Sequence, residues 1–484
     1  MNAHDITASL PIIVTAATAI LLMLIVAIRR NHKLTFAVSL TGIAVAFASL
    51  WPAEEGGSRA LGALLLVDAF ALFYMGLVLA ATAAILLYAY SYLDAQPEHK
   101  EEFYILVLLA SAGAMVLVAS SHFASFFLGL EILSVALYAL VAYLRTGPRP
   151  LEAGMKYLIL ASSSAAFLLF GMALIYEETG SLEFGRISDV FQSQSGSNGL
   201  LVAGATLLMT GIGFKLALVP FHLWTPDVYQ GAPLPVTALV ATISKASVFA
   251  LLLRWLHPSS TASNPVWLVL AVSAVGSMLA GNLLALFQNN VKRILAYSSI
   301  AHMGYFLVAV LAGGNLGSQA ATYYLIAYIV TITGAFAVLT MTCRGEAEAC
   351  EISDFRGLFW RRPILAAVFT AMLLSLAGIP LTAGFLGKFY VLTAGVSSAT
   401  WALVLILIVS SVIGLFYYLR IVVALYAPAD ESALPLVSGT LPITGTLSLT
   451  ALTILLFYFG VYPAVLWRAV AFAIDSLNRS GLTS

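Results

Sequence analysis

Apolar runs of about twenty residues recur along this chain from one end to the other. A helix of that length crosses the ~30 Å hydrocarbon core of a bilayer and satisfies its backbone hydrogen bonds internally. Of the 484 residues, 61% are hydrophobic and only 9% are charged, whereas soluble domains carry roughly 25% charged residues. A β-barrel would instead show short segments of alternating polarity. We therefore expect an all-α polytopic membrane protein.

The apolar runs predict about fourteen transmembrane helices. The first run ends at Arg29 and Arg30 and not at a small-residue cleavage site, so we expect it to remain as a span. A short interfacial helix is expected to follow the last span, over 464–477. The expected spans are 9–28, 34–51, 69–92, 104–121, 123–144, 154–176, 199–224, 233–256, 266–287, 293–313, 319–343, 363–395, 401–426 and 442–467.

The distribution of Lys and Arg predicts the orientation of the chain, because cytoplasmic loops of inner-membrane proteins are enriched in basic residues. If both termini are periplasmic, the cytoplasmic loops hold twelve basic residues and the periplasmic segments hold five. We therefore predict a multi-pass protein of the bacterial inner membrane with periplasmic N- and C-termini. The twelve are Arg29, Arg30, Lys33, Lys100, Arg145, Arg149, Lys292, Arg293, Arg344, Arg356, Arg361 and Arg362, and the five are Arg59, Arg186, Arg254, Arg468 and Arg479.

The other five basic residues fall inside apolar segments: Lys156, Lys215, Lys245, Lys388 and Arg420. A charged side chain at the bilayer centre costs at least ~2.5–3.5 kcal/mol, so each needs a polar partner, a hydrated cavity or a reach to the interface. Lys156 and Arg420 lie near span ends and can extend to the interface. The other three lysines lie too deep, which indicates an internal polar environment.

Span 5, FASFFLGLEILSVALYALVAYL, carries a single carboxylate, Glu131, near its middle. Burial favours the protonated form of such a group, and a nearby lysine reverses that preference. A glutamate beside a lysine has two interpretations. The pair is either a fixed contact that orients helices or a switch that loads and releases protons.

Span 7, GIGFKLALVPFHLWTPDVYQGAP, has Lys215 near its middle and two prolines after it. Proline removes a backbone donor and clashes with the preceding turn, so we expect the helix to break after Lys215. Irregular backbone at membrane depth is tolerated where it is buried in protein or lines a hydrated cavity. His222 and Asp227 then lie on the irregular part as candidates for proton relay or uptake. A structural hydrogen bond is an equal alternative for each.

Span 12 repeats this device, because LSLAGIPLTAGFLGKFYVL places Gly378 and Pro380 before Lys388. Two interrupted apolar segments in corresponding positions are typical of transporters built from inverted repeats. We predict discontinuous helices 7 and 12, one in each of two inverted five-helix units. The predicted units are an N-terminal three-helix segment over 1–103, the first repeat over 104–258, the second repeat over 266–426 and a C-terminal helix and tail over 427–484.

Two further ionisable residues lie between the broken spans. Lys245 is deep in span 8, and His302 lies about two turns inside span 10. Histidine has a reference pKa of about 6.5, which suits proton relay, and a structural hydrogen bond is the alternative. Together with Glu131, Lys215 and Lys388, these residues predict a row of ionisable groups at mid-membrane depth, which packing alone does not explain.

The strings FLGLEILS, GFKLALVPFHLWTPDVYQGAP, NNVKRILAYSSIAHMGY, RGLFWRRPILAAVF and SLAGIPLTAGFLGKFYVL resemble the antiporter-like membrane-arm subunits of bacterial NADH-quinone oxidoreductase, complex I. The resemblance covers essentially the whole chain. It implies a fourteen-helix subunit with two inverted repeats, in which a span 5 glutamate and lysines of spans 7, 8 and 12 form the proton path. Those positions here are Glu131, Lys215, Lys245 and Lys388, with Lys156, His222, Asp227 and His302 as further candidates for relay or uptake.

The resemblance implies a subunit that translocates protons while partner subunits carry electrons from NADH to quinone. We expect no cofactor in this chain, because it has no GxGxxG fingerprint and only two cysteines, too few for an iron–sulfur cluster. FMN, iron–sulfur clusters and quinone are expected in partner subunits. The expected partners are the other membrane-arm subunits, including the sister antiporter-like subunits, and the bilayer, but not nucleic acid. An Mrp-type cation/proton antiporter subunit and a non-pumping scaffold are the alternatives.

Overall fold

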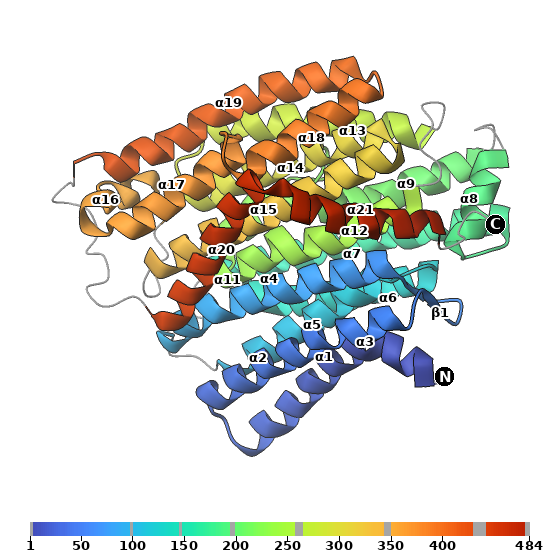
Figure 1. Cartoon of the computed structure of the whole chain (residues 1–484), viewed down its shortest axis with the longest axis horizontal. Coiled ribbons are helices and arrows are strands. Elements are labelled where there is room, and N and C mark those ends of the chain that lie inside the picture. Colours follow the sequence, from blue (N-terminus) through green and yellow to red (C-terminus); the bar gives the residue numbers. More distant parts are fainter. Residues whose placement is uncertain are drawn as a thin grey trace.

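The computed structural model of the chain describes residues 3–96, 100–144, 148–193, 199–256, 265–342, 350–428 and 442–479. Most of its helices run side by side along the long axis of one bundle (Figure 1). The first helix begins and the last helix ends at the same end of the bundle, which we call the terminal end (Figure 1). The opposite end, where the first helix turns into the second, is called the loop end.

Within the described residues, thirteen helices are long and apolar enough to cross a membrane. A further crossing is divided between two short helices, α17 (Pro363–Ala377) and α18 (Ala383–Ser397). Together with this divided crossing, the helices agree with the predicted number of about fourteen. The chain is therefore a multi-pass membrane protein.

The N-terminal region is a helical hairpin followed by a small β-hairpin and a long helix. Asn31 and Asp68 cap two of these helices, since their side-chain oxygens accept hydrogen bonds from the backbone amides of Leu34 and Ala71. The antiparallel β-hairpin was not predicted, because its strands have three residues each. The elements are α1 (Ala3–Ile28), α2 (His32–Ala48), α3 (Leu50–Glu55), β1 (Arg59–Leu61), β2 (Leu65–Val67) and α4 (Ala69–Asp94).

The next region contains the first of the two interrupted spans, in which α9 (Gly199–Leu216) stops and α10 (Trp224–Gly231) follows. The span expected over 233–256 contains a π-helical turn, η1 (Val240–Ser244), directly before Lys245. The other elements are α5 (Glu101–Val118), α6 (Phe123–Val141), α7 (Pro148–Thr179), α8 (Phe184–Ser193), α11 (Leu234–Leu239) and α12 (Lys245–Leu256).

The last region contains the second interrupted span and ends in two helices that form a V across the front of the bundle (Figure 1). The final helix agrees with the short helix predicted after the last span. The elements besides α17 and α18 are α13 (Pro265–Leu286), α14 (Val291–Ala312), α15 (Gly314–Thr342), η2 (Ile352–Phe355), α16 (Leu358–Arg361), α19 (Trp401–Tyr426), α20 (Ile443–Val461) and α21 (Pro463–Arg479).

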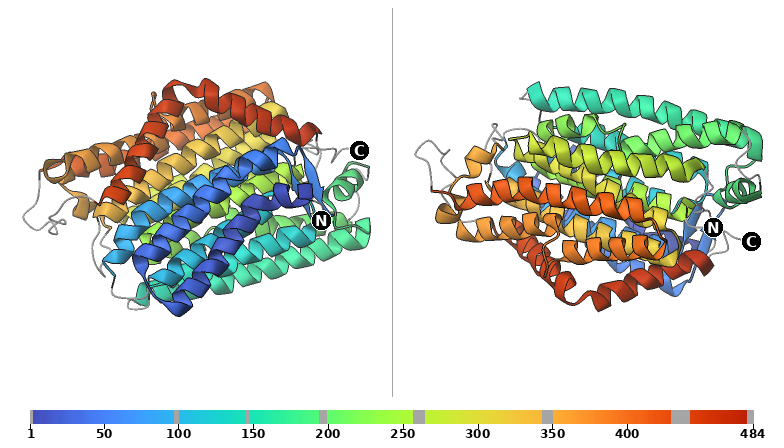
Figure 2. Two further views of the ribbon diagram at one scale, coloured as in Figure 1. Left: turned by 60° about the horizontal axis from the view of Figure 1, so that its bottom comes forward. Right: turned by 90° about the horizontal axis from the view of Figure 1, so that it is seen from above.

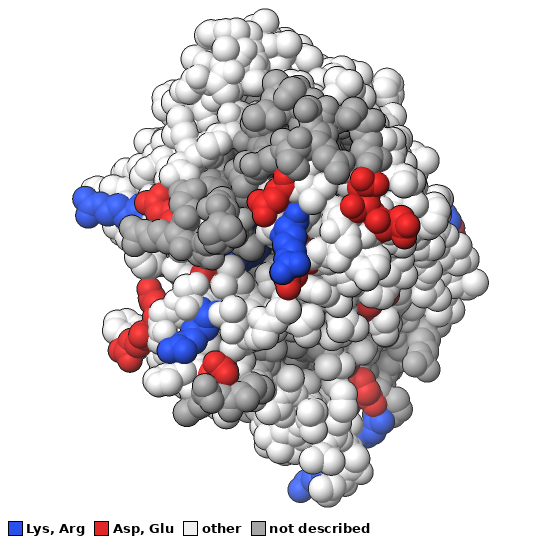
Figure 3. Space-filling model, turned by 90° about the vertical axis from the view of Figure 1, so that its right-hand side faces the viewer, with Lys and Arg blue, Asp and Glu red and all other residues white. Residues whose placement is uncertain are grey.

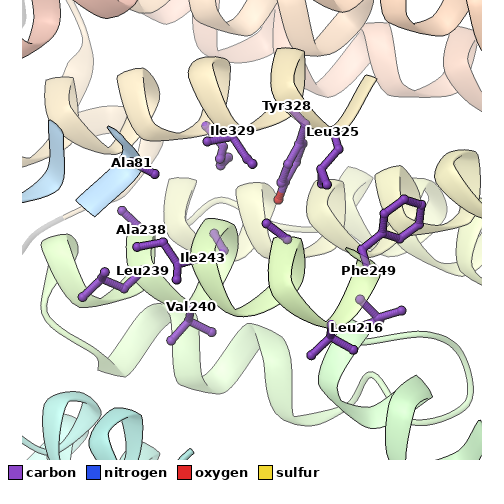
Figure 4. Packing of buried hydrophobic residues seen from close by; sticks show 14 of the residues in the cluster. Ala81, Leu216, Ala238, Leu239, Val240, Ile243, Phe249, Leu325, Tyr328 and Ile329 are labelled. Atoms are coloured by element: carbon purple, nitrogen blue, oxygen red, sulfur yellow. The ribbon is translucent and has the colours of Figure 1, made fainter. Parts of the chain in front are cut away.

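Three spans form the centre of the bundle. The most apolar window of α15 and that of the α11–α12 span are completely buried, and that of α14 is 94% buried, compared with 28% for α1. Figure 4 shows Leu325 and Tyr328 of α15 extending toward the α11–α12 span. Two views of the bundle show that α1 and α19 lie on its outside (Figures 1 and 2). A polar side chain on a central span is therefore shielded from lipid by other helices.

The terminal end has a mostly uncharged face over which acidic and basic side chains are scattered (Figure 3). The charge count assigned Arg254 to this side, near the end of the span expected over 233–256. It belongs to α12, is only 1% exposed and pairs with Asp68 inside the bundle. Arg145, Arg344 and Cys343 lie outside the described residues.

Candidate functional site

Lys215 lies in the last turn of α9, directly before the break in its span. The helix ends at Leu216, as predicted from the prolines that follow, and Ala217 has a positive φ of 60°. The indole of Trp224 donates a hydrogen bond to the Phe214 carbonyl oxygen near the end of α9. Lys215 itself is 3% exposed. The break therefore places a lysine at a helix end inside the protein.

Glu131 and Lys215 come together through α6. The Lys215 Nζ donates a hydrogen bond to Ser134 Oγ at 2.6 Å, and Ser134 lies one turn after Glu131. The ammonium also lies 5.4 Å from the ring centre of Tyr157 on α7. Among the described residues, Glu131 Oε1, Tyr157 Oη and Thr225 Oγ1 are buried without a hydrogen-bond partner. Glu131 and Tyr157 thus bring polar atoms to the surroundings of Lys215 that no other described residue satisfies.

Lys245 follows the π-helical turn and has 0% exposure. Its Nζ donates to Ser299 Oγ on α14 at 2.6 Å, and the hydroxyl of Tyr328 on α15 contacts the same serine oxygen at 2.6 Å. Tyr229 Oη donates to Ser299 at 3.3 Å. Ser299 therefore joins Lys245 to two tyrosines. π-helical turns occur frequently at functional sites.

His302 lies one turn beyond Ser299 on α14 and is 2% exposed. Its Nδ1 contacts Tyr324 Oη at 2.6 Å, and its Nε2 contacts Tyr418 Oη at 3.2 Å. Tyr418 Oη in turn contacts Ser298 Oγ. Both ring nitrogens of this central histidine are therefore engaged with tyrosine hydroxyls from α15 and α19.

Lys388 lies on α18, across the second break from the end of α17. Its Nζ donates to the carbonyl oxygens of Leu376 and Ala377 and to Ser411 Oγ, each at 2.9 Å. The last carbonyls of a helix lack partners within the helix, so a lysine is suited to this position. Gly378 has a φ of +88°, and a Cβ there would lie 2.9 Å from Lys388 Cδ. A glycine is therefore required both for the turn and for the approach of the lysine.

The central row continues from His302 to Lys388 through Tyr305. The rings of His302 and Tyr305 lie 5.4 Å apart, and the Lys388 Nζ lies 5.2 Å from the centre of the Tyr305 ring. The amide nitrogen of Asn282 donates to Tyr305 Oη at 2.8 Å. Lys245, His302 and Lys388 are thus connected by short polar and aromatic steps across four helices.

Lys156 and Asp227 meet at the loop end, on α7 and α10. Asp227 was predicted on the irregular part of its span, but the chain becomes helical again at Trp224, so Asp227 lies on a short helix. The Lys156 Nζ lies 2.9 Å from Asp227 Oδ2 and 2.7 Å from Glu152 Oε1, and Arg293 from α14 donates to Asp227 Oδ1 at 2.8 Å. Burial alone would raise the pKa of Asp227, but hydrogen bonds from Arg293 and Lys156 outweigh burial and hold this pKa below its ordinary value. Asp227 is therefore a carboxylate at neutral pH.

His222 lies on the irregular segment between α9 and α10, as predicted, and is 7% exposed. In the described part of the chain, neither of its ring nitrogens has a hydrogen-bond partner. The described contacts therefore do not join His222 to another candidate residue.

Several residues of the site were missed by the sequence reasoning. Ser134, Ser299 and Ser411 each accept a hydrogen bond from one buried lysine. Serine within an apolar helix is common, so the residue type alone gives no signal. The buried Asp68–Arg254 pair was also missed, although the two side chains form bonds of 2.7 and 2.9 Å with 0% side-chain exposure.

Comparison with known proteins identifies the family. A family model described as "NADH:quinone oxidoreductase/Mrp antiporter, TM" matches residues 120–414. NADH-quinone oxidoreductase subunit N of Ectopseudomonas mendocina (strain ymp) is 47% identical over 488 residues, covering 97% of this chain and 96% of that protein. The chain belongs to the NADH-quinone oxidoreductase subunit N family. The resemblance inferred from the sequence strings is confirmed.

Solved structures agree with this family. A chain of respiratory complex I from Thermus thermophilus superposes with a TM-score of 0.82 at 33% identity, covering 96% of this chain and 99% of that chain. A chain of the Mrp complex from Dietzia sp. DQ12-45-1b has a TM-score of 0.84 at 20% identity, covering 100% of this chain and 99% of that chain. The second likeness shows the fold alone. The fold of this subunit N family member is thus shared by a chain of respiratory complex I and a chain of the Mrp complex.

Proposed function

We propose that this chain carries protons across the bacterial inner membrane as a subunit of an NADH-quinone oxidoreductase. The observation that carries the proposal is the row of buried lysines, Lys215, Lys245 and Lys388, each hydrogen-bonded to a serine. A permanently charged lysine in this position is costly, and a lysine that gains and loses a proton is suited to a hydrated path. Membership of the subunit N family supports the same function.

In the proposed route, Lys215 takes up a proton beside the α9–α10 break, and Glu131 changes the stability of its protonated form. Lys245 passes the proton through Ser299 and His302, and Lys388 releases it. The hydroxyl and imidazole contacts between these residues support such a relay, because each is a donor and an acceptor. Orphaned oxygens near Lys215 supply sites where water can complete the first part of the route.

The driving energy must reach this chain from partner subunits. Moving one proton against the membrane potential costs about 2.3 kcal/mol per 100 mV. FMN, iron–sulfur clusters and quinone belong to partner subunits in this proposal, and the sister antiporter-like subunits are direct neighbours. Changes in charge or conformation at such an interface would shift the proton affinity of the buried lysines one after another.

The proposal also includes the orientation and the internal repeats. The loop end is cytoplasmic and the terminal end is periplasmic, as the distribution of basic residues predicts. The segments 104–258 and 266–426 are two inverted units. Each contains one interrupted span with a lysine close to the break, which supports this division.

The decisive experiment measures protons pumped per NADH oxidised in purified complex reconstituted into liposomes. Glu131→Ala and Lys215→Ala are each expected to lower that ratio while NADH oxidation with a water-soluble acceptor stays normal. Assembly of each variant is checked by the presence of all partner subunits. A normal ratio in both variants would favour the scaffold interpretation, in which the buried charges only hold helices together.

An Mrp-type antiporter subunit is the second candidate, supported by the fold shared with the Mrp complex. The two functions predict different partners. Purification of the tagged chain from its native membrane is expected to recover NADH-oxidising subunits together with bound flavin. Recovery of a flavin-free complex that exchanges Na⁺ for protons would favour the antiporter.

A further inference from the structure

A small polar cavity opens at the loop end, between α7 and α10. Its volume is about 150 Å³. This is enough for more than one water molecule, whose share of liquid volume is roughly 30 Å³. It has four ionisable side chains around it, two basic and two acidic. The lining residues are Arg149, Glu152, Ala153, Lys156, Asp227, Gln230 and Gly231.

Asp227 is held by a cation on each of its two oxygens. Arg293 donates to Oδ1 at 2.8 Å, and Lys156 donates to Oδ2 at 2.9 Å. A carboxylate bound in this way is stabilised in its charged form. Its protonation becomes more favourable once one of the two cations has moved away.

The two cations differ in how firmly they are fixed. Arg293 also donates to Gln230 Oε1 and to Gln288 Oε1, each at 3.0 Å, and its side chain is 24% exposed. The planar guanidinium makes all three contacts at once, so leaving Asp227 would disturb the whole set.

Lys156 is 44% exposed and has a second carboxylate within reach, since Glu152 lies one turn earlier on the same helix at 2.7 Å. It can therefore release Asp227 and remain paired. An exposed pair of this kind contributes little to the stability of the fold, so Lys156 can exchange between the two carboxylates readily.

The cavity is linked to the surroundings of Lys215 through residues next to its lining, since Tyr157 follows Lys156 and Trp224 lies three residues before Asp227. Trp224, on the first turn of α10, stacks on Tyr157 with ring centres 4.9 Å apart, and Tyr157 lies 5.4 Å from the Lys215 Nζ. The Tyr157 and Thr225 oxygens at this layer are buried and have no partner among the described residues. One aromatic layer with two orphaned oxygens thus lies between Asp227 and Lys215.

We propose that Asp227 is the carboxylate that receives protons for Lys215 and that Lys156 controls its protonation by moving between Asp227 and Glu152. Lys156 in this role is called the guard. This inference rests on the proposed proton-transport function. When Lys156 pairs with Glu152 alone, Asp227 Oδ2 accepts a proton from water and becomes a neutral carboxylic acid. When that proton passes inward, the carboxylate forms again and draws Lys156 back. The guard therefore closes each time a proton has left.

The test compares four variants of the assembled complex in liposomes, and the rate of proton pumping is measured against NADH oxidation. Glu152→Gln removes the alternative partner and keeps Lys156 on Asp227, so pumping is expected to fall by up to about fivefold. The double variant, Glu152→Gln with Lys156→Met, also removes the guard. It is expected to recover pumping to within about twofold of the native rate. Asp227→Asn is expected to abolish pumping through this chain, and Asp227→Glu is expected to retain part of it.

A purely structural clamp predicts the opposite order, because the double variant loses more contacts than Glu152→Gln and should be at least as impaired. That result would overturn the inference, as would normal pumping in Asp227→Asn. Lys215→Ala serves as the reference for the proposed function. Loss of pumping in Lys215→Ala with normal pumping in Asp227→Asn rejects only the guard, whereas normal pumping in both variants rejects the transport function itself. Variants are compared only in complexes that contain all partner subunits.

Discussion

Lys215 and Lys388 both lie beside a broken helix, but the chain supplies them with different numbers of hydrogen-bond acceptors. An ammonium group has three donors. Among the described residues, Lys388 finds three acceptors, two carbonyls and a serine, whereas Lys215 has one serine. The residues around the two lysines differ in the same way. Buried oxygens near Lys215 have no partner among the described residues, whereas the tyrosine hydroxyls around His302 are hydrogen-bonded. In the proposed path, the first half would therefore depend on water, and the second half would be built largely from protein groups.

Replacing each lysine in turn is expected to show the difference between the two halves most clearly, in the yield and thermal stability of the complex. Lys388→Met leaves the carbonyls of Leu376 and Ala377 without their partner at the end of α17, which costs about 1–3 kcal/mol for each buried group. Lys215→Met leaves Ser134 still bonded to the Leu130 carbonyl. We expect Lys388→Met to lower the yield and thermal stability of the assembled complex and Lys215→Met to leave both near native values. Equal losses in the two variants would contradict the difference in acceptors.

The second break is also expected to be sensitive to a single methyl group. Gly378→Ala combines a left-handed backbone, which costs a residue with a Cβ roughly 1–2 kcal/mol, with a close approach to the Lys388 side chain. Gly57→Ala is the matched control, since its φ is +70° and nothing lies within 4 Å of the added atom. Pumping should fall in Gly378→Ala and stay normal in Gly57→Ala, with a small stability loss in both. Normal pumping in Gly378→Ala would show that the position of Lys388 is less constrained than its contacts indicate.

Replacing the serine that bonds each lysine tests the comparison by removing a single hydrogen bond. Ser134→Ala removes the serine acceptor of Lys215, and a hydrogen bond to a charged group contributes about 1.5–3 kcal/mol. Ser411→Ala removes one acceptor of Lys388 and leaves two carbonyls. We expect pumping to fall by about tenfold or more in Ser134→Ala and by less than about twofold in Ser411→Ala. Similar losses in both would indicate that water replaces either serine equally well.

The two halves also differ in what their sequence reveals. Lys215 and Lys388 were located by the glycines and prolines near them, because these residues break helices through local backbone chemistry. The number of spans followed from apolar length in the same way. The partners of the lysines did not follow, since Ser134, Ser299 and Tyr324 become neighbours only when helices distant in sequence pack together. Arg254 shows the same limit: charge counting placed it at the correct end, but its pairing with Asp68 depends on tertiary structure.

The smallest expected effect concerns two tyrosine hydroxyls. Tyr324→Phe removes the partner of His302 Nδ1, and an unsatisfied buried group costs about 1–3 kcal/mol, so the thermal stability of the complex should fall. Tyr157→Phe removes a hydroxyl that has no partner among the described residues, so stability should be unchanged or slightly higher. If water binds that hydroxyl between Asp227 and Lys215, pumping in Tyr157→Phe should still fall, by up to about tenfold for the net contribution of one hydrogen bond. Normal pumping together with normal stability in Tyr157→Phe would mean that protons reach Lys215 by a route that avoids this aromatic layer. The hydrated first half of the proposed path would then have to run through other residues than Tyr157 and Trp224.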